Sequence, residues 1–281
     1  MRTLKDMTVV ITGASAGIGA ELARQLSAKG ARLALTARRR DRLDALNAEL
    51  GGRHVVIVAD VSRQEDCQRL IDESFAALGR IDTLVCNAGF GLYPPVHETT
   101  PAEVRELFAT NVYGTTDCIY AAVPRMLQQP IRDGWRGQVM IVSSAAARRS
   151  VPYLGVYSAT KAAQLSVAES MRVELRPQRL AVTSVHPIMT KTEFGDAAEA
   201  RGRIKLPRGN DAMTQTVGHV ARRMVAAIER PRPEVWPSRL VGVGLSFATL
   251  LPGIADRMLA KYRRDVEKAN PVPSPGTPGE S

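Results

Sequence analysis

The chain has 281 residues, of which 44% are apolar and 23% charged, and its formal net charge is +10. This composition allows a sizeable buried core and excludes a globally disordered chain. The three cysteines, Cys67, Cys86 and Cys118, are widely spaced in apolar runs, which argues against a disulfide framework and indicates a reducing, cytoplasmic compartment. The scattered histidines indicate no metal site, and the first apolar run is too short for a secretion signal.

Short apolar, β-branched runs alternate with segments of helical period along the chain. The runs predict strands at Thr8–Thr12, Arg32–Thr36, His54–Val58, Thr83–Cys86, Val139–Val142 and Ala181–Val185. The helical segments are Ala20–Lys29, Arg40–Leu50, Gln64–Leu78, Ala102–Met126 and Ser158–Leu175. Strands that are apolar throughout are buried on both sides, and strand–helix alternation gives right-handed crossovers. We therefore predict an α/β fold with a doubly wound parallel sheet of the Rossmann type.

The domain organisation follows from the same pattern. Residues 1–265 are predicted to form a single domain, in which residues 193–265 provide a variable lid and a C-terminal helical region that is apolar and basic. The segment Phe194–Arg208 is expected to be a mobile lid. Residues 266–281 end in a stretch rich in Pro, Gly and Ser and are expected to be a disordered tail.

A glycine-rich turn follows the first predicted strand, in the stretch Thr12-Gly13-Ala-Ser15-Ala-Gly17-Ile18-Gly19. Gly13 permits a tight bend, Gly17 lets the backbone approach a pyrophosphate, and Gly19 lets helix and strand pack closely. The start of the following helix offers free N–H groups and the positive end of its dipole. The position of this turn predicts a dinucleotide site.

The end of the second strand indicates which dinucleotide is bound. An NAD site is expected to have a carboxylate here for the ribose 2′-hydroxyl, whereas this chain has Ala37 followed by Arg38. A guanidinium can bind a 2′-phosphate through two hydrogen bonds. We therefore predict NADP(H) as the cofactor, bound through Arg38.

The stretch from Ser144 to Lys161 carries the predicted chemistry. Tyr157 and Lys161 are four residues apart at the start of a helix, so the ammonium can lie near the phenol. A free tyrosine has a pKa of about 10, and a nearby cation favours the phenolate. Ser144 lies at a strand end, where its hydroxyl can hold a substrate oxygen.

Taken together, these motifs resemble those of the short-chain dehydrogenase/reductase family, in its compact single-domain branch. The resemblance covers residues 7–192. It rests on the glycine turn, on Asp60-Val61, Asn87-Ala88-Gly89 and Asn111, on Ser144 with the Tyr157–Lys161 pair, and on the element Pro187…Thr192. It implies hydride transfer between NADP(H) and a small-molecule carbonyl or alcohol.

The resemblance also implies a role for each residue. Tyr157 is expected to be the general acid/base, Lys161 to lower its pKa and bind the nicotinamide ribose, Ser144 to orient the substrate, and Asn111 to hold a water that reaches Lys161. Asp60 and Val61 are expected at the adenine, and Asn87 to Gly89 beside the adenosine ribose. The remaining cofactor-binding residues are Gly13, Ser15, Gly17, Ile18, Gly19, Arg38, Pro187, Thr190 and Thr192.

One departure from the family pattern concerns the loop after the sixth strand. The family has Pro-Gly there, and this chain has Pro187-Ile188. A β-branched residue does not readily adopt a positive φ, so the loop near Thr190 and Thr192 is expected to follow a different path.

The substrate class is indicated only broadly. Ala146, Val151, Tyr153, Leu154 and the loop Gly89–Pro95 are candidate lining residues and mostly apolar, which favours a lipophilic substrate. Arg148 and Arg149 would instead suit an anionic group, or are simply solvated. Two other functions stay open, a catalytically silent dinucleotide sensor or scaffold and an epimerase or dehydratase, although such enzymes are usually longer.

The C-terminal quarter holds most of the positive charge. Thirteen basic residues and four acidic ones lie between Arg201 and Arg264, without a nucleic-acid-binding motif, so no nucleic acid is expected as a partner. The stretch Leu240–Ala255 carries no charge and is short for a bilayer-spanning helix. It is expected to be buried against the domain, to form a subunit interface in a homodimer or homotetramer, or to make a peripheral membrane contact through residues 236–264.

Overall fold

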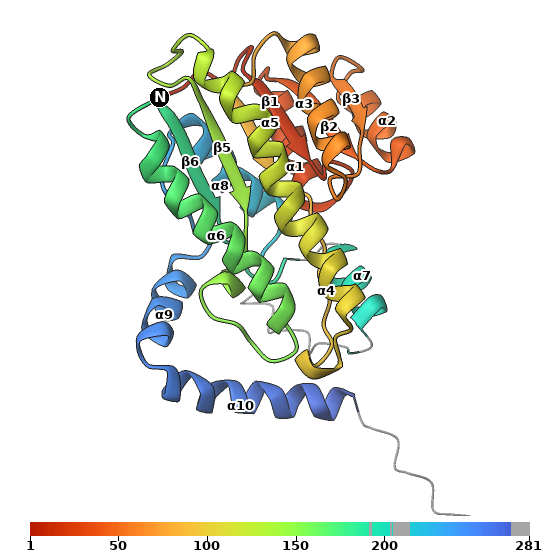
Figure 1. Ribbon diagram of the computed structural model, residues 1–281, viewed down its shortest axis with the longest axis vertical. Coiled ribbons are helices and arrows are strands. Elements are labelled where there is room, and N and C mark those ends of the chain that lie inside the picture. Colours follow the sequence, from red (N-terminus) through yellow and green to blue (C-terminus); the bar gives the residue numbers. More distant parts are fainter. Residues whose placement is uncertain (191–192, 203, 205–213, 271–281) are drawn as a thin grey trace, which may run out of the picture.

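The computed structural model describes residues 1–190, 193–202, 204 and 214–270. Within them lies one sheet of seven parallel strands in the order β3-β2-β1-β4-β5-β6-β7 (Figure 1). The strands are β1 (Thr8–Thr12), β2 (Arg32–Ala37), β3 (Val55–Val58), β4 (Thr83–Cys86), β5 (Gly137–Val142), β6 (Leu180–Val185) and β7 (Glu234–Val235). The predicted doubly wound Rossmann-type fold is confirmed.

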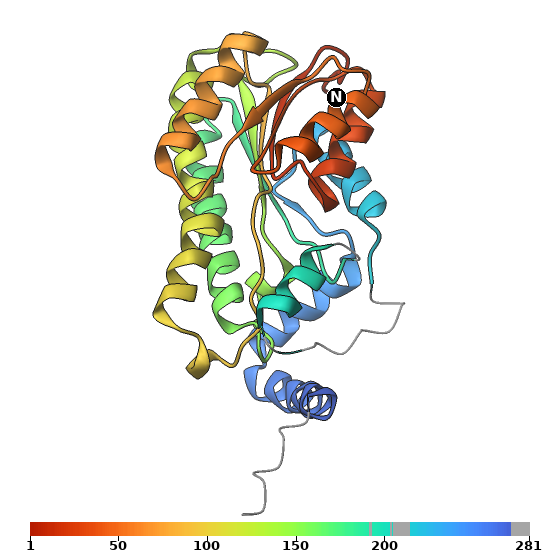
Figure 2. The same cartoon turned by 90° about the vertical axis from the view of Figure 1, so that its right-hand side faces the viewer.

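Helices cover both sides of the sheet, as Figure 2 shows. One side carries α1 (Gly17–Ala28), α2 (Arg40–Glu49) and α8 (Val217–Glu229). The other carries α3 (Gln64–Leu78), α5 (Gly114–Gln128) and α6 (Gly155–Leu175). Val9 and Ile11 of β1 pack toward the first layer and Val10 toward the second. This two-sided burial is why the central positions of most strands are apolar on both sides of the sheet.

Several element boundaries differ from the prediction for local reasons. Helix α1 begins at Gly17 rather than Ala20, because the last glycines of the turn form its first turn. The long helix predicted at Ala102–Met126 is α4 (Pro101–Phe108) and α5 joined by a π-helical turn at Ala109–Tyr113. Helix α8 and strand β7 were not predicted, since their segment was interpreted only by its charge.

The C-terminal region contains α9 (Arg239–Leu250) and α10 (Pro252–Ala269), which lies across one end of the molecule (Figure 1). The boundary predicted for the tail is wrong at its start, because residues 266–269 belong to α10. Val266 is buried there, and Asn270 Nδ2 donates to the Val266 carbonyl and closes the helix. The rest of the predicted tail lies outside the described residues. So does part of the predicted lid, of which α7 (Glu193–Gly202) is described.

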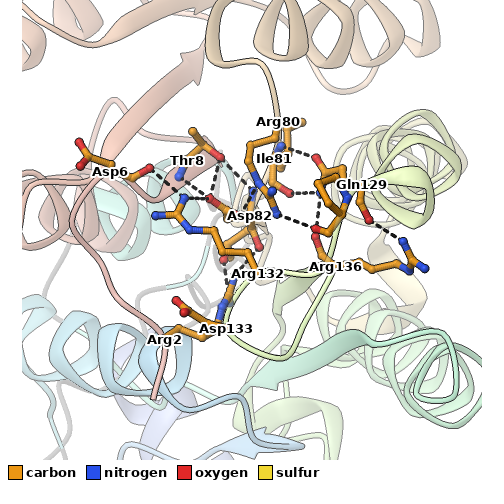
Figure 3. A network of polar contacts seen from close by, with 12 residues as sticks. Arg2, Asp6, Thr8, Arg80, Ile81, Asp82, Gln129, Arg132, Asp133 and Arg136 are labelled. Atoms are coloured by element: carbon orange, nitrogen blue, oxygen red, sulfur yellow. Dashed lines mark hydrogen bonds and ion pairs between the residues drawn. The ribbon is translucent and has the colours of Figure 1, made fainter.

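A buried polar network joins the amino ends of the strands (Figure 3). Asp82, which is 1% exposed, accepts hydrogen bonds from Thr8 N at 3.0 Å, Arg80 Nε at 2.8 Å and Arg132 Nη1 at 3.1 Å. Arg2 Nη2 donates to the Asp82 carbonyl at 2.7 Å. Burial lowers the pKa of Arg2 to about 10, although the negative charge of Asp82 opposes this effect. This edge of the sheet is thus fixed by paired charges.

Candidate active site

The predicted site residues lie at the opposite edge, where the strands end. The glycine turn follows β1, Arg38 follows β2, Asp60 follows β3, Asn87 follows β4 and Ser144 follows β5. In open parallel sheets, ligands bind at this edge where neighbouring connections diverge to opposite sides. The order of the strands therefore brings together residues that are far apart in the sequence.

The glycine turn is closed against the segment after β4. Gly13 has a φ of +66°, and a Cβ there would come within 2.8 Å of the Ala88 Cα. Asn87 Nδ2 donates to the carbonyls of Thr12 and Gly13, at 2.9 and 3.1 Å. Ala16 precedes α1 and has no side-chain group to cap it, so the first N–H groups of α1 are available to an anion.

Two arginines approach this turn from β2. Arg38 is 68% exposed, with Nη1 3.9 Å from Asp60 Oδ2. Arg39 Nη2 donates to Ser15 Oγ at 3.1 Å, and so links the second strand to the glycine turn. The prediction named Arg38 alone. The run of three arginines gave the signal for Arg39, but it did not reveal which of them reaches the turn.

The segment after β4 also approaches the π-helical turn and helix α6. A Cβ on Gly89 would lie 2.9 Å from Asn111 Oδ1 and 3.5 Å from Lys161 Nζ. Asn111 Nδ2 donates to the Phe90 carbonyl and to Thr160 Oγ1, at 3.0 and 3.1 Å. The missing side chain of Gly89 therefore leaves room for the side chains of Asn111 and Lys161 beside it.

The phenol of Tyr157 lies in an apolar environment. Burial raises its pKa to about 12, and a hydrogen bond from the Ser144 hydroxyl works in the opposite direction. Ser144 Oγ is itself held by the Ala146 N–H, at 3.1 Å. The Ser144 hydroxyl therefore lies next to the Tyr157 phenol, whose raised pKa keeps it protonated at neutral pH.

The side chain of Lys161 is 3% exposed. Its Nζ donates to the Val142 carbonyl at 3.0 Å and to Gln164 Oε1 at 2.9 Å. Both acceptors are neutral, so burial lowers the pKa of Lys161 to about 7. The expected lowering of the Tyr157 pKa by Lys161 stays a prediction. The ammonium lies 5.7 Å from the centre of the phenol ring and is aimed at the two carbonyl oxygens.

Gln164 was not identified from the sequence. Its Nε2 donates to the Asn111 carbonyl at 2.6 Å and to Thr115 Oγ1 at 2.8 Å. Its amide therefore connects Lys161 with the π-helical turn. The sequence does offer one indication of its role, because Gln164 lies three residues after Lys161 and therefore on the same side of α6.

An apolar cluster covers the phenol. Its buried members are Leu92, Leu107 and Tyr157, and Phe90, Leu154 and Phe194 pack against them. The Phe194 ring meets the Tyr157 ring edge-on, with 5.9 Å between centroids. Arg201, at the other end of α7, pairs with Glu106 and lies over the Phe90 ring. Helix α7 therefore closes this cluster in the structure.

The loop after β6 lies against the segment that follows β5 and contains Ser144. The Ala145 N–H donates to the Pro187 carbonyl at 3.0 Å, and Thr190 Oγ1 donates to the Ile188 carbonyl at 2.8 Å. Ile188 keeps an ordinary negative φ. Thr192 lies outside the described residues.

His186, which was not predicted, stacks on Trp236 with its Nδ1 3.3 Å from the Ser144 carbonyl.

The residues present fit a nicotinamide dinucleotide. The close approach at Gly13 and the uncapped start of α1 leave backbone N–H groups for a pyrophosphate. Arg38 and Arg39 supply positive charge at the end of β2. Lys161 and Tyr157 lie farther along the same edge, beyond Asn87 and Gly89. The described residues hold no cluster of His, Cys, Asp or Glu suited to a metal ion.

Comparison with known proteins gives consistent matches. A family model described as short chain dehydrogenase matches residues 7–202. The 11-beta-hydroxysteroid dehydrogenase 1A of Arabidopsis thaliana is 36% identical over 222 residues, which cover 76% of this chain and 61% of that protein. The chain thus spans about three fifths of this relative's length. An uncharacterized oxidoreductase of Bacillus subtilis, YxnA, is 29% identical over 266 residues, covering 93% of this chain and 73% of that protein.

Solved structures agree with the fold. An alcohol dehydrogenase from the archaeon Thermococcus sibiricus, in complex with 5-hydroxy-NADP, matches with a TM-score of 0.70 and 26% identity. The match covers 82% of this chain and 94% of that chain.

Proposed function

The chain belongs to the short-chain dehydrogenase family, and from this premise we propose that it is an NADP(H)-dependent oxidoreductase that interconverts a carbonyl and an alcohol on a lipophilic small molecule. One observation carries the proposal: Ser144, Tyr157 and Lys161 lie along the same edge of the sheet as the glycine turn.

The chain's own residues supply the proton chemistry. The nicotinamide, when bound, supplies or accepts the hydride at the substrate carbon. In the reducing direction, the Ser144 hydroxyl holds the carbonyl oxygen and Tyr157 gives that oxygen its phenolic proton. In the oxidising direction the phenolate takes the proton back. The positive charge of Lys161 favours the phenolate in both directions.

The preference for NADP(H) rests on the end of β2. Arg38 is exposed there beside Asp60, with no acidic residue at position 37 or 39, and Arg39 binds Ser15 of the glycine turn. A doubly charged 2′-phosphate suits these guanidiniums.

The preference for a lipophilic substrate rests on the covering of Tyr157. Phe90, Leu92, Leu154 and Phe194 belong to the apolar cluster that includes Tyr157, and none of them offers a polar side-chain group to a substrate. The alternative of an anionic substrate is less favoured, because Arg148 pairs with Glu234 and Arg149 with Asp256. The plant relatives named as hydroxysteroid dehydrogenases are consistent with an apolar substrate.

The test is NADPH consumption against a panel of lipophilic ketones and aldehydes, with NADPH binding followed in parallel by fluorescence. Tyr157→Phe is expected to lower turnover about 10²–10⁴-fold and to leave NADPH binding intact. Tyr120→Phe, a change at an exposed tyrosine of α5, is the matched control. Binding without consumption by the unaltered protein on the whole panel would instead identify a silent sensor.

The cofactor preference has its own test. Arg38→Glu is expected to weaken NADPH binding at least tenfold and NADH binding much less, because it removes a partner of the 2′-phosphate alone. An unchanged ratio of the two dissociation constants would remove Arg38 from the account.

A further inference from the structure

The α9–α10 elbow carries an apolar stripe that the described residues leave exposed. On α9, Leu240, Val243, Phe247 and Leu250 recur every three or four residues and so share one side of the helix. Leu240 is 87% exposed and Leu250 74%. The opposite side of α9 packs on the domain, where a Cβ on Gly242 would come within 2.9 Å of the Trp236 indole. The predicted burial of this stretch therefore holds for one side only.

Helix α10 continues the stripe and adds positive charge. Ala255 and Val266 are buried and define the side that faces the domain. Ile254 and Met258, 54% and 73% exposed, continue the apolar stripe past the elbow. Next to them, four exposed basic residues recur at helical spacing and share one side, which we call the basic stripe: Arg257, Lys261, Arg264 and Lys268.

The charge of the basic stripe is largely uncompensated. Among the described residues, no ion pair involves any of its four members. Of the acidic residues on α10, Asp256 pairs with Arg149 and Glu267 with Arg263, which leaves Asp265. Exposed apolar residues beside clustered positive charge are the pattern of a helix that lies on an anionic membrane.

Among the described residues, no single helix meets the length and hydropathy expected of a membrane-crossing helix, whereas Leu240–Leu250 and Pro252–Ala269 meet them only jointly and are bent by 117°. A second copy of the chain is the other candidate occupant. A two-fold interface uses the same surface of both copies, so it would bring two basic stripes toward each other.

We propose that the α9–α10 elbow docks on an anionic membrane surface, with the apolar stripe at the level of the acyl chains and the basic stripe on the lipid headgroups. Each basic residue near such a surface strengthens binding by about fivefold, and added salt screens this attraction. Binding should therefore require acidic lipid and weaken as the salt concentration rises.

The experiment is co-sedimentation of the full chain with vesicles of phosphatidylcholine alone or with phosphatidylglycerol added. We expect the protein to sediment with the acidic vesicles and to stay in solution with neutral ones. The double change Lys261→Glu/Arg264→Glu should weaken binding at least 25-fold, since it removes two cations. Arg176→Glu/Arg179→Glu, at the far end of α6, makes the same change of charge at exposed positions and should have little effect.

A separate variant tests the apolar part. Phe247→Ser/Leu250→Ser should weaken binding to acidic vesicles and leave the circular dichroism spectrum unchanged, because both side chains are exposed. The proposal is overturned if the native chain ignores acidic vesicles. It is also overturned if light scattering shows an oligomer that this apolar variant converts to monomer while vesicle binding stays the same.

A second, independent observation concerns Gln164. Its amide lies between Lys161 Nζ and the Asn111 carbonyl, with 2.9 and 2.6 Å on the two sides, and it is 1% exposed. Thr115 Oγ1 accepts from the same Nε2 and donates to the same carbonyl. The Asn111 carbonyl is available because a π-helical turn interrupts the helix there, a distortion that is frequent at functional sites.

Within the described part of the chain, the other groups around Lys161 are uncharged. On its own helix the titratable neighbour is Tyr157, β5 presents the Val142 carbonyl, and the segment after β4 presents Gly89. An acceptor for the ammonium proton therefore contributes directly to keeping this amine charged. On the basis of the proposed function, we infer that Gln164 is a positioning residue, which holds the charged Lys161 ammonium beneath the site and links it to Asn111.

The test is the pH profile of alcohol oxidation by the holoenzyme. Gln164→Leu removes an acceptor from the ammonium, so Lys161 is charged less often and the phenolate is less favoured. The rate of oxidation rises with pH as the phenolate forms. In this variant, the rise should occur at a pH about one unit higher. Gln164→Asn keeps an amide acceptor without adding a charge and should displace that rise less than Gln164→Leu does.

A merely structural role would lower the rate at every pH without displacing that rise, and that result would overturn the inference. The failure of the proposed function is distinguishable, because then the unaltered protein would show no turnover to profile.

Discussion

Two buried cations lie at opposite edges of the same sheet, and their surroundings differ. Arg2 is 4% exposed near the Asp82 carboxylate, and its pKa falls only to about 10. Lys161 is 3% exposed among neutral carbonyl oxygens, and its pKa falls to about 7. A buried charge without an opposite charge costs stability, so it is retained where it is needed for chemistry. The amino edge thus stabilises the fold, and the carboxyl edge carries the site.

The largest loss of stability is expected from a change at Asp82, the buried anion of the amino edge. Asp82→Asn leaves Arg80, Arg132 and Arg2 without their buried anion, and we expect a loss of about 3–5 kcal/mol in the free energy of unfolding. Urea unfolding measures it. Asp133→Asn, an exposed acid whose carboxylate accepts from Thr3 N in the same corner, should cost under about 1 kcal/mol. Equal losses in the two variants would refute the structural role of Asp82.

The lowered pKa of Lys161 makes the stability of the chain depend on pH. Lys161 has a pKa of about 7 in the folded chain and about 10.5 when unfolded, so between these values the unfolded chain binds the extra proton. Stability contributed by this group therefore rises with pH across that window, by at most about 1.4 kcal/mol per pH unit.

Urea unfolding of the wild type and of Lys161→Met between pH 7 and 9.5 tests this sign. The wild type should gain stability relative to the variant as the pH rises, and Lys261→Met, at an exposed lysine, should show no such trend. A constant difference between wild type and Lys161→Met would mean that Lys161 titrates as an ordinary exposed lysine.

The smallest expected effect is at Phe194, which covers Tyr157. Phe194→Ala admits water to the phenol, so the pKa of Tyr157 should fall from about 12 toward the ordinary value for tyrosine. Ultraviolet difference titration against Tyr157→Phe measures it. Phe247→Ala, at an exposed phenylalanine, is the control and should leave the titration of Tyr157 in place.

The sequence predicted the carboxyl edge better than the amino edge. Gly13, Ser144, Tyr157 and Lys161 stand in motifs whose spacing reflects one local turn or one helix face, and the structure places them together. Asp82 and Arg2 meet through contacts that span 80 residues, which no local pattern reveals.

Two features of the site were also beyond local patterns. The place of Gln164 depends on the π-helical turn at Asn111, because only that distortion presents the carbonyl to its amide. The direction of the Lys161 side chain depends on the Val142 carbonyl of a neighbouring strand. The expected effect of Lys161 on the Tyr157 pKa therefore stays a prediction.

The most direct test of the contrast between the two edges is a nuclear magnetic resonance titration of the lysine side chains in the cofactor-free protein, with Lys161→Arg used to assign the signal. We predict that Lys161 titrates with a midpoint near pH 7. A midpoint above about pH 10, as for an ordinary lysine, would contradict the account of an uncompensated cation at the carboxyl edge.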